Sequence, residues 1–188
     1  MKLYDQVKRY KPFNKQETKD KKVMLNFINN YNDILIRKNK IAHFSASGWI
    51  LNKEKTKVLM IYHNIYDSWA WTGGHADGEE NLLKVALLEA EEETGLKNVK
   101  PIKTDIFSLE IITVKGHVKR GKYVSSHLHM NLTYLLEADE NRELVVKPDE
   151  NSGVRWFDIN EVVDSSSEPW MRLIYNKLNK KCINYGLI

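Results

Sequence analysis

Apolar residues recur along the chain with two different periods, and each period predicts a different kind of element. Between residues 14 and 36 they recur every three or four positions, which predicts an amphipathic helix. Its apolar face would consist of Met24, Phe27, Ile28, Tyr31 and Leu35. Asn14 is a suitable N-cap, and Glu17 occupies the third helical position, as a capping box requires. A second helix is predicted from about residue 168 to residue 181.

Segments rich in branched and aromatic residues, separated by polar breaks, predict the strands. These segments are 41–51, 57–63, 104–115 and 123–137, with a shorter strand around 154–157. Two of them alternate polar and apolar residues, which is the period of a half-buried strand. The polar positions are His43, Ser45, Ser47 and Trp49 in one strand and Ser125, His127, His129, Asn131 and Thr133 in the other. On one wall of a cleft they would offer hydrogen bonds to a phosphate or a sugar. The alternative is an ordinary solvated sheet face, which is the preferred interpretation for His43.

Strands mixed with a few helices in this order predict an α/β or α+β sandwich. The first helix precedes all the strands, so residues 1–39 are expected to form a helical extension packed on a domain of residues 40–188. Glycine and proline are scarce, and no flexible linker is expected between the two parts.

The most informative segment is the run from Gly73 to Leu96, which combines a glycine pair, a turn and a helix. Asp77 and Gly78 supply turn residues before the helix, and Gly95 supplies a left-handed stop after it. The helix carries three carboxylates at helical spacing, namely Glu89, Glu92 and Glu93. Like charges so close together repel one another, and a hard divalent cation such as Mg²⁺ would offset that cost.

This run resembles the Nudix box. The pattern of that box is glycine, five residues, glutamate, seven residues, arginine-glutamate, an apolar residue, any residue, two glutamates, any residue, glycine and an apolar residue. The positions on pattern are Gly74, Glu80, Glu89, Ala90, Glu92, Glu93, Gly95 and Leu96. Leu88 departs from it, because the family usually has arginine there. The match is far more specific than a short glycine motif.

The resemblance implies the Nudix α/β/α fold with a mixed sheet, and a hydrolase that cuts a diphosphate linkage in a nucleoside diphosphate joined to another group. It implies Mg²⁺ or Mn²⁺ as the cofactor, which would polarise the phosphoryl oxygens and lower the pKa of the attacking water. The implied metal ligands are Glu89 and Glu93, Glu92 directly or through water, and the carbonyl of Gly73. The implied loop-supporting residues are Gly74, Glu80 and Gly95, with Glu80 normally paired to the arginine that is missing here.

Leu88 can neither orient the neighbouring glutamate nor compensate its charge. A cation from elsewhere in the chain could replace the arginine, the enzyme could be slower, or the site could bind metal without catalysis. Because every carboxylate is present, we expect retained activity. Two other functions stay open, a nucleotide sensor that does not cleave and a prenyl diphosphate isomerase of the same fold. The isomerase needs a cysteine on a strand at the cleft, whereas the single cysteine, Cys182, lies in the C-terminal helix region.

Candidates outside the box come from the strands and loops. For a catalytic base we consider Asp139, Glu140, Asp149 and Glu150, and we prefer Glu150 because its acidic turn directly precedes a strand. The candidate substrate contacts are His75, His127, His129 and Trp71. Core packing is the alternative to base stacking for Trp71. His127 and His129, separated by one residue, also suggest a zinc site as an alternative. The oxygen ligands of the box favour magnesium or manganese instead.

Composition narrows the function classes further. The chain has 188 residues, of which 42% are hydrophobic and 29% charged, as expected for one substantial globular domain. It has no apolar run long enough to cross a membrane, and its charged N-terminus does not fit a secretory signal. A single cysteine excludes an internal disulfide and fits a cytoplasmic location.

The net charge of +4 does not by itself indicate nucleic-acid binding, so nucleic acid is not the expected partner. Basic residues do gather between two predicted strands, at Lys115, His117, Lys119, Arg120 and Lys122. They would either hold phosphates near a metal site or form a solvated hairpin tip. The expected partner is a small phosphorylated, nucleotide-like substrate. The oligomeric state stays open, with a homodimer as one option.

Overall fold

The structure is a computed structural model that describes residues 1–119 and 121–188. Within these residues a mixed sheet of eight strands forms the centre of the molecule, in the order β10-β2-β1-β9-β5, with β3 paired to β2, β4 to β1 and β6 to β9. The strands are β1 (Ala42–Leu51), β2 (Lys57–His63), β3 (Ser68–Ala70), β4 (Thr72–His75), β5 (Lys100–Pro101), β6 (Ser108–Val114), β9 (His127–Glu137) and β10 (Asn151–Asp158). The central pair, β1 and β9, is parallel. Two further strands, β7 (His117–Lys119) and β8 (Lys122–Val124), pair only with each other among the described residues.

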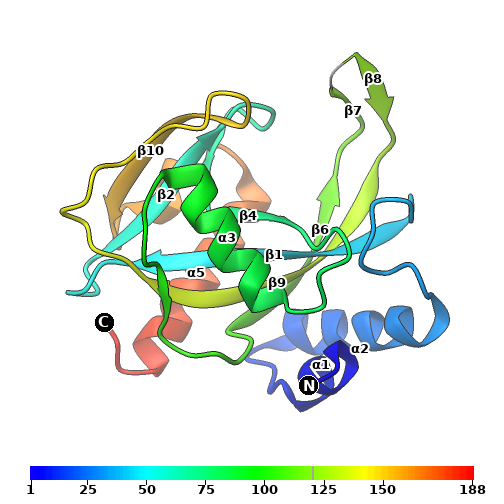
Figure 1. Cartoon of the computed structure of the whole chain (residues 1–188). Helices are drawn as coiled ribbons and strands as arrows, with labels where there is room; N and C mark the ends of the chain where they lie inside the picture. The colour runs from blue at the N-terminus through cyan, green and yellow to red at the C-terminus, as the bar shows by residue number, and fades with distance from the viewer. Residues whose placement is uncertain (120) are drawn as a thin grey trace.

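Helices cover both faces of this sheet. They are α1 (Leu3–Arg9), α2 (Lys15–Asn30), α3 (Leu82–Thr94), α4 (Val162–Ser165) and α5 (Pro169–Asn184). Figure 1 shows α3 crossing one face of the sheet and α5 on the opposite face, with α1 and α2 packed together beside β6. The α/β/α sandwich expected from the sequence is therefore confirmed.

The alternation of side chains along β1 builds the two cores. Phe44 and Ile50 point toward the cluster that contains the apolar residues of α3, whereas Trp49 and Leu51 point toward the cluster that contains those of α5. All of them are buried, so β1 has apolar residues on both faces, as a central strand must.

The first long helix begins where the sequence predicts, but it ends early. Asn14 caps it by accepting a hydrogen bond from the Glu17 amide at 2.9 Å. The carboxylate of Glu17 accepts from the Phe13 amide instead of closing a capping box on Asn14. The predicted continuation to residue 36 is wrong, because α2 stops at Asn30 and the carbonyl of Ile34 is used by the Phe44 amide of β1, at 2.8 Å. The short α1 is not apparent from the sequence pattern.

The strand predictions are correct in position and inexact in length. The segment 104–115 is regular only from Ser108 to Val114, and 123–137 is divided into β8 and β9. The strand around 154–157 is longer, from Asn151 to Asp158, while β3, β4 and β5 are too short to give a periodic signal.

The proposed boundary at residue 39 stays a prediction. Val7 of α1 and Met24 and Phe27 of α2 lie in the same apolar cluster as the residues of α3. None of the helices in the described part of the chain combines the length and apolar character of a membrane span.

Candidate active site

The helix α3 and the loop before it have the local geometry that the sequence predicts. The turn contains two residues with positive φ, Asp77 at 46° and Gly78 at 96°. Asn81 caps the helix by accepting from the Lys84 amide, and Gly95 ends it in the left-handed conformation with φ of 74°. The helix therefore starts and stops where it can present Glu89 and Glu93 to the pocket.

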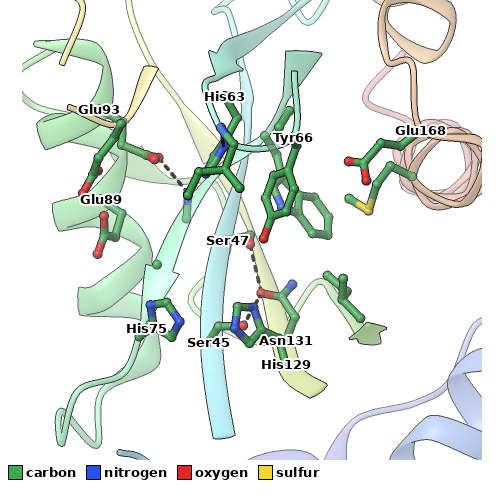
Figure 2. A pocket seen from close by; sticks show the side chains of 18 of the residues that line it. Ser45, Ser47, His63, Tyr66, His75, Glu89, Glu93, His129, Asn131 and Glu168 are labelled. Carbon is green, nitrogen blue, oxygen red and sulfur yellow. Dashed lines mark hydrogen bonds between the residues drawn. The ribbon is translucent and has the colours of Figure 1, made fainter. Parts of the chain in front are cut away.

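Three carboxylates meet beside this helix. Oxygen atoms of Glu89, Glu93 and Glu150 all lie within 4.8 Å of one another. Glu93 is only 3% exposed and accepts a hydrogen bond from the Gly73 amide at 2.8 Å, a contact drawn in Figure 2. Glu150 comes from the loop before β10, so the preferred base candidate lies in the same cluster as the two box glutamates.

Burial makes this cluster unfavourable without a cation. Burial is the main cause that raises the pKa of Glu89 to about 6, and the nearby Glu150 carboxylate raises it as well. Burial also raises the pKa of Glu93 well above its usual range, although the Gly73 amide acts against it. Three carboxylates so close together offer oxygen ligands and negative charge, which is what a hard divalent cation prefers.

Glu92 lies apart from this cluster. Its side chain is 59% exposed and accepts a hydrogen bond from the Lys147 ammonium at 3.1 Å. The same ammonium lies 3.1 Å from the Glu150 carboxylate, so Lys147 links a box glutamate to the loop of Glu150. Leu88, in the position of the usual arginine, is 47% exposed. Glu80 is also exposed and forms no ion pair within the part of the chain that the structure describes.

Asn151 fixes the loop that carries Glu150, and the sequence analysis does not single it out. Its side-chain amide donates to the Glu93 carbonyl at 2.9 Å, while its side-chain oxygen accepts from the Lys147 amide at 3.2 Å. The backbone of Glu150 is held as well, since its carbonyl accepts from the Asn64 amide at 3.1 Å. No sequence pattern marks this role, because the burial of Asn151 follows only from the folded structure.

The polar faces of β1 and β9 form one wall of the pocket. Their parallel register places His43 beside His129, Ser45 beside Asn131 and Ser47 beside Thr133. The hydroxyl groups of Ser45 and Ser47 donate to Asn131 at 3.0 and 2.9 Å (Figure 2). Asn131 in turn donates to the buried carboxylate of Glu110 on β6. The shared wall is confirmed, and the pocket that it bounds has a volume of about 230 Å³.

The candidate substrate contacts divide between the pocket and its surroundings. Trp71, His75 and His129 line the pocket, whereas His127 is not among its lining residues. Trp71 is buried against Tyr175 of α5, with ring centroids 5.6 Å apart. Burial, with a smaller contribution from the neighbouring His75, lowers the pKa of His129 to about 2, so His129 is neutral at physiological pH.

The basic residues between residues 115 and 122 do not line the pocket as far as they are described. They lie on or beside the β7–β8 hairpin, which projects from the body of the molecule in Figure 1. Arg120 lies outside the described residues. The only cysteine, Cys182, is buried in the cluster beneath α5, so it does not meet the requirement of an isomerase.

Comparisons with known proteins agree with this architecture. The NUDIX domain profile matches residues 42–178. An RNA pyrophosphohydrolase of Pelagibacter ubique (strain HTCC1062) is 30% identical over 119 residues, which cover 61% of this chain and 75% of that protein.

Solved structures support the fold. The Nudix hydrolase RenU of M. smegmatis superposes with a TM-score of 0.56 at 18% identity, covering 76% of this chain and 86% of that one. The E. coli dihydroneopterin triphosphate pyrophosphohydrolase gives a TM-score of 0.52 at 16% identity, covering 71% and 92%. The chain belongs to the Nudix family and is a pyrophosphohydrolase of the Nudix type.

Proposed function

We propose that this chain hydrolyses a phosphoanhydride bond in a nucleoside diphosphate linked to another group, or in a similar small nucleotide, with Mg²⁺ or Mn²⁺ as the cofactor. The observation that carries the proposal is the meeting of Glu89, Glu93 and Glu150 in one pocket. Glu89 and Glu93 would hold the ion, with the Gly73 carbonyl as a further oxygen donor and the Glu150 carboxylate beside them. When bound, such an ion would neutralise charge on the phosphoryl oxygens and lower the pKa of a water molecule.

The protein's own residues position the reacting groups. Glu93 is fixed by the Gly73 amide, and Glu150 is fixed by a loop tied to α3 through Asn151. Glu150 can therefore take the proton from the attacking water at a defined place beside the box helix. Lys147 supplies the positive charge that Leu88 does not, because it contacts both Glu92 and Glu150. Glu92 then acts as a positioning residue for Lys147.

The pocket wall gives the proposed substrate its contacts. Ser45 and Ser47 line this wall, and because their protons are donated to Asn131, their hydroxyl oxygens offer acceptors to sugar hydroxyl groups. His75 and His129 line the same pocket, and Trp71 could stack on a base at its edge. The similarity to an RNA pyrophosphohydrolase adds RNA to the substrates worth screening.

Substitution of single glutamates tests the carboxylate assignment. Glu89→Gln and Glu93→Gln should each reduce turnover about a hundredfold or more, since each removes an anionic ligand of the proposed ion. Glu91→Gln is the matched control on the same helix, because Glu91 lies outside the carboxylate cluster. Formation of the cleaved products is measured by chromatography with nucleotide sugars, dinucleotides, nucleoside triphosphates and RNA, each with and without Mg²⁺. Unchanged turnover in both variants would overturn the assignment.

The same screen separates an enzyme from a sensor. A sensor would bind one nucleotide tightly in the presence of Mg²⁺ and give no product over long incubation. The proposed hydrolase gives product that depends on the ion and on Glu93.

A further inference from the structure

Four histidines from three strands gather at one end of the pocket wall. They are His43 on β1, His75 on β4, and His127 and His129 on β9. One ring nitrogen of each lies within 4.8 Å of those of the other three. The strand register explains the gathering, because His43 pairs with His129 and Ser45 pairs with His75. Figure 2 shows His75 and His129 at the end of the pocket away from Glu93.

Backbone carbonyl groups set the orientation of two of these rings. The Nδ1 atom of His43 lies 3.1 Å from the Asn39 carbonyl, and the Nδ1 atom of His127 lies 2.8 Å from the Ser125 carbonyl. A carbonyl oxygen can only accept, so each Nδ1 carries the proton and each Nε2 presents a lone pair. A hydrogen bond from the outer ring nitrogen to a carbonyl is the arrangement that orients metal-binding histidines.

The lone pair of His43 has no partner of its own. His43 is only 3% exposed, and its Nε2 atom has no hydrogen-bond partner within the part of the chain that the structure describes. A buried polar atom of this kind costs free energy unless it is bound. His127 and His129 are close enough to share a ligand, with their Nε2 atoms 3.2 Å apart.

We propose that these four histidines bind a divalent transition-metal ion of the zinc class, at a site separate from the carboxylates of Glu89, Glu93 and Glu150. Zinc–nitrogen bonds of about 2.05 Å in a tetrahedron place neighbouring nitrogen atoms about 3.3 Å apart, close to the separation of His127 and His129. The remaining nitrogens, within 4.8 Å, need a contraction of about 1.5 Å at most to reach that geometry. Neutral imidazole suits zinc and related ions, whereas magnesium prefers oxygen.

An ion in this site would connect the strands that form the pocket. It would tie β4, which carries Gly73 and Gly74, to the β1–β9 pair through side chains as well as through backbone hydrogen bonds. Its ligands differ from those of the proposed catalytic ion. Zinc binding can therefore be measured apart from phosphoanhydride hydrolysis, even though His75 and His129 also line the pocket.

The test uses the full-length protein after removal of bound metal with a chelator. Zn²⁺ and Co²⁺ are added in the presence of excess Mg²⁺, and stoichiometry, thermal melting and the visible absorption of bound Co²⁺ are measured. We expect one ion per chain, the absorption spectrum of tetrahedral Co²⁺, and a higher melting temperature with Zn²⁺. The ion should remain bound in Glu89→Gln and Glu93→Gln.

Histidine variants identify the ligands. His43→Gln and His127→Gln should each weaken Zn²⁺ binding by more than about tenfold, and the double variant should abolish it. His127 is half-buried, so its variant stays informative if His43→Gln fails to fold. His117→Gln, which lies outside the cluster, is the control. Absence of binding, loss of binding in the glutamate variants, or unchanged binding in both histidine variants would overturn the proposal. Stabilisation by inorganic phosphate alone, with no bound metal, would assign the cluster to an anion instead.

Discussion

Gly74 lies where any larger residue would meet the carboxylate of Glu89. A Cβ atom at this position would lie 2.0 Å from Oε1 of Glu89, far inside van der Waals contact. The end of a glutamate side chain can move away at little cost in stability, but this side chain belongs to the carboxylate cluster. We therefore predict that Gly74→Ala lowers turnover at least about tenfold, as expected when a reacting group is displaced by about 1 Å, with little change in melting temperature.

Gly78→Ala is the control, and we expect it to lower stability without lowering turnover. A Cβ atom at Gly78 meets nothing within 4 Å, but its φ of 96° is unfavourable for alanine. This variant should lose about 1 kcal/mol of stability and keep its turnover. If Gly74→Ala behaves in the same way as Gly78→Ala, the displacement of Glu89 is not the cause of its effect.

Lys147 is expected to replace the arginine that the box lacks. Lys147→Ala should lower turnover by several-fold to about tenfold, because Glu150 and Glu92 lose the cation that lies between them. Leu88→Arg places a guanidinium one helical turn before Glu92, so it should restore part of the activity of Lys147→Ala and change the wild type little. Turnover of the four proteins measures the coupling. If the effects of Lys147→Ala and Leu88→Arg on turnover are simply additive in the double variant, Lys147 does not replace the missing arginine.

The sequence predicts the candidate residues of the site, on one helix, one loop and two strands, and misses the contacts that hold them in place. Helical spacing places Glu89 and Glu93 at the edge of the core and Glu92 further round, as the structure has them. The partner of Glu92 could not be predicted, since Lys147 is 55 positions away. Asn131 and Glu110 are likewise brought together by the pairing of β6 with β9, which no local pattern encodes.

At the scale of elements, one buried ion-pair network joins α2, β6 and α5. Glu17 of α2 is fully buried and accepts hydrogen bonds from Lys181 at 2.9 Å and from Ser108 at 2.8 Å. Lys177 lies 3.2 Å from Glu17 and 2.7 Å from Glu110. Glu110 then contacts Asn131, so the network connects the N-terminal helices to the pocket wall.

Removal of one charged partner should show how much this network contributes to the free energy of unfolding. We predict that Glu17→Ala destabilises the fold by about 3–5 kcal/mol, because it leaves Lys181 buried without its carboxylate. Chemical denaturation measures the loss, and Glu143→Ala is the control at an exposed acidic position. A change below 1 kcal/mol would show that the buried lysines find water or other partners.

The carboxylate of Glu17 should also make the stability of the fold depend on pH. Burial raises the pKa of Glu17, but the charges of Lys181 and Lys177 outweigh it, and the pKa lies below the usual 4.5. A lowered pKa in the folded state adds stability above the unfolded value, and that stability is lost as the pH falls below about 4.5. Glu17→Gln should therefore unfold with a shallower pH dependence below pH 4.5 than the wild type. If stability falls equally with pH in the wild type and in Glu17→Gln, Glu17 is not the source of the pH dependence.

Element boundaries show what local patterns leave undetermined. The apolar spacing of α2 continues past Asn30, yet tertiary hydrogen bonding decides the end, since the Ile34 carbonyl pairs with β1. The strands β3 and β4 have three and four residues, and they exist because longer neighbours supply their hydrogen bonds. Such elements follow from the assembled sheet and not from their own composition.

At the scale of the whole molecule, the predicted boundary at residue 39 can be tested by truncation. Val7, Met24 and Phe27 are buried in the main core, and each contributes about 1.5–3 kcal/mol. Together with the loss of Glu17, this approaches the whole stability of a typical domain, about 5–15 kcal/mol. We predict that residues 31–188 do not fold cooperatively, as measured by circular dichroism during thermal melting, while removal of residues 186–188 has little effect. A truncated chain that keeps both its melting transition and its turnover would instead show that the first two helices are not needed for folding, as a boundary near residue 39 implies. In that case the N-terminal helices would be an addition to the Nudix core and not part of it.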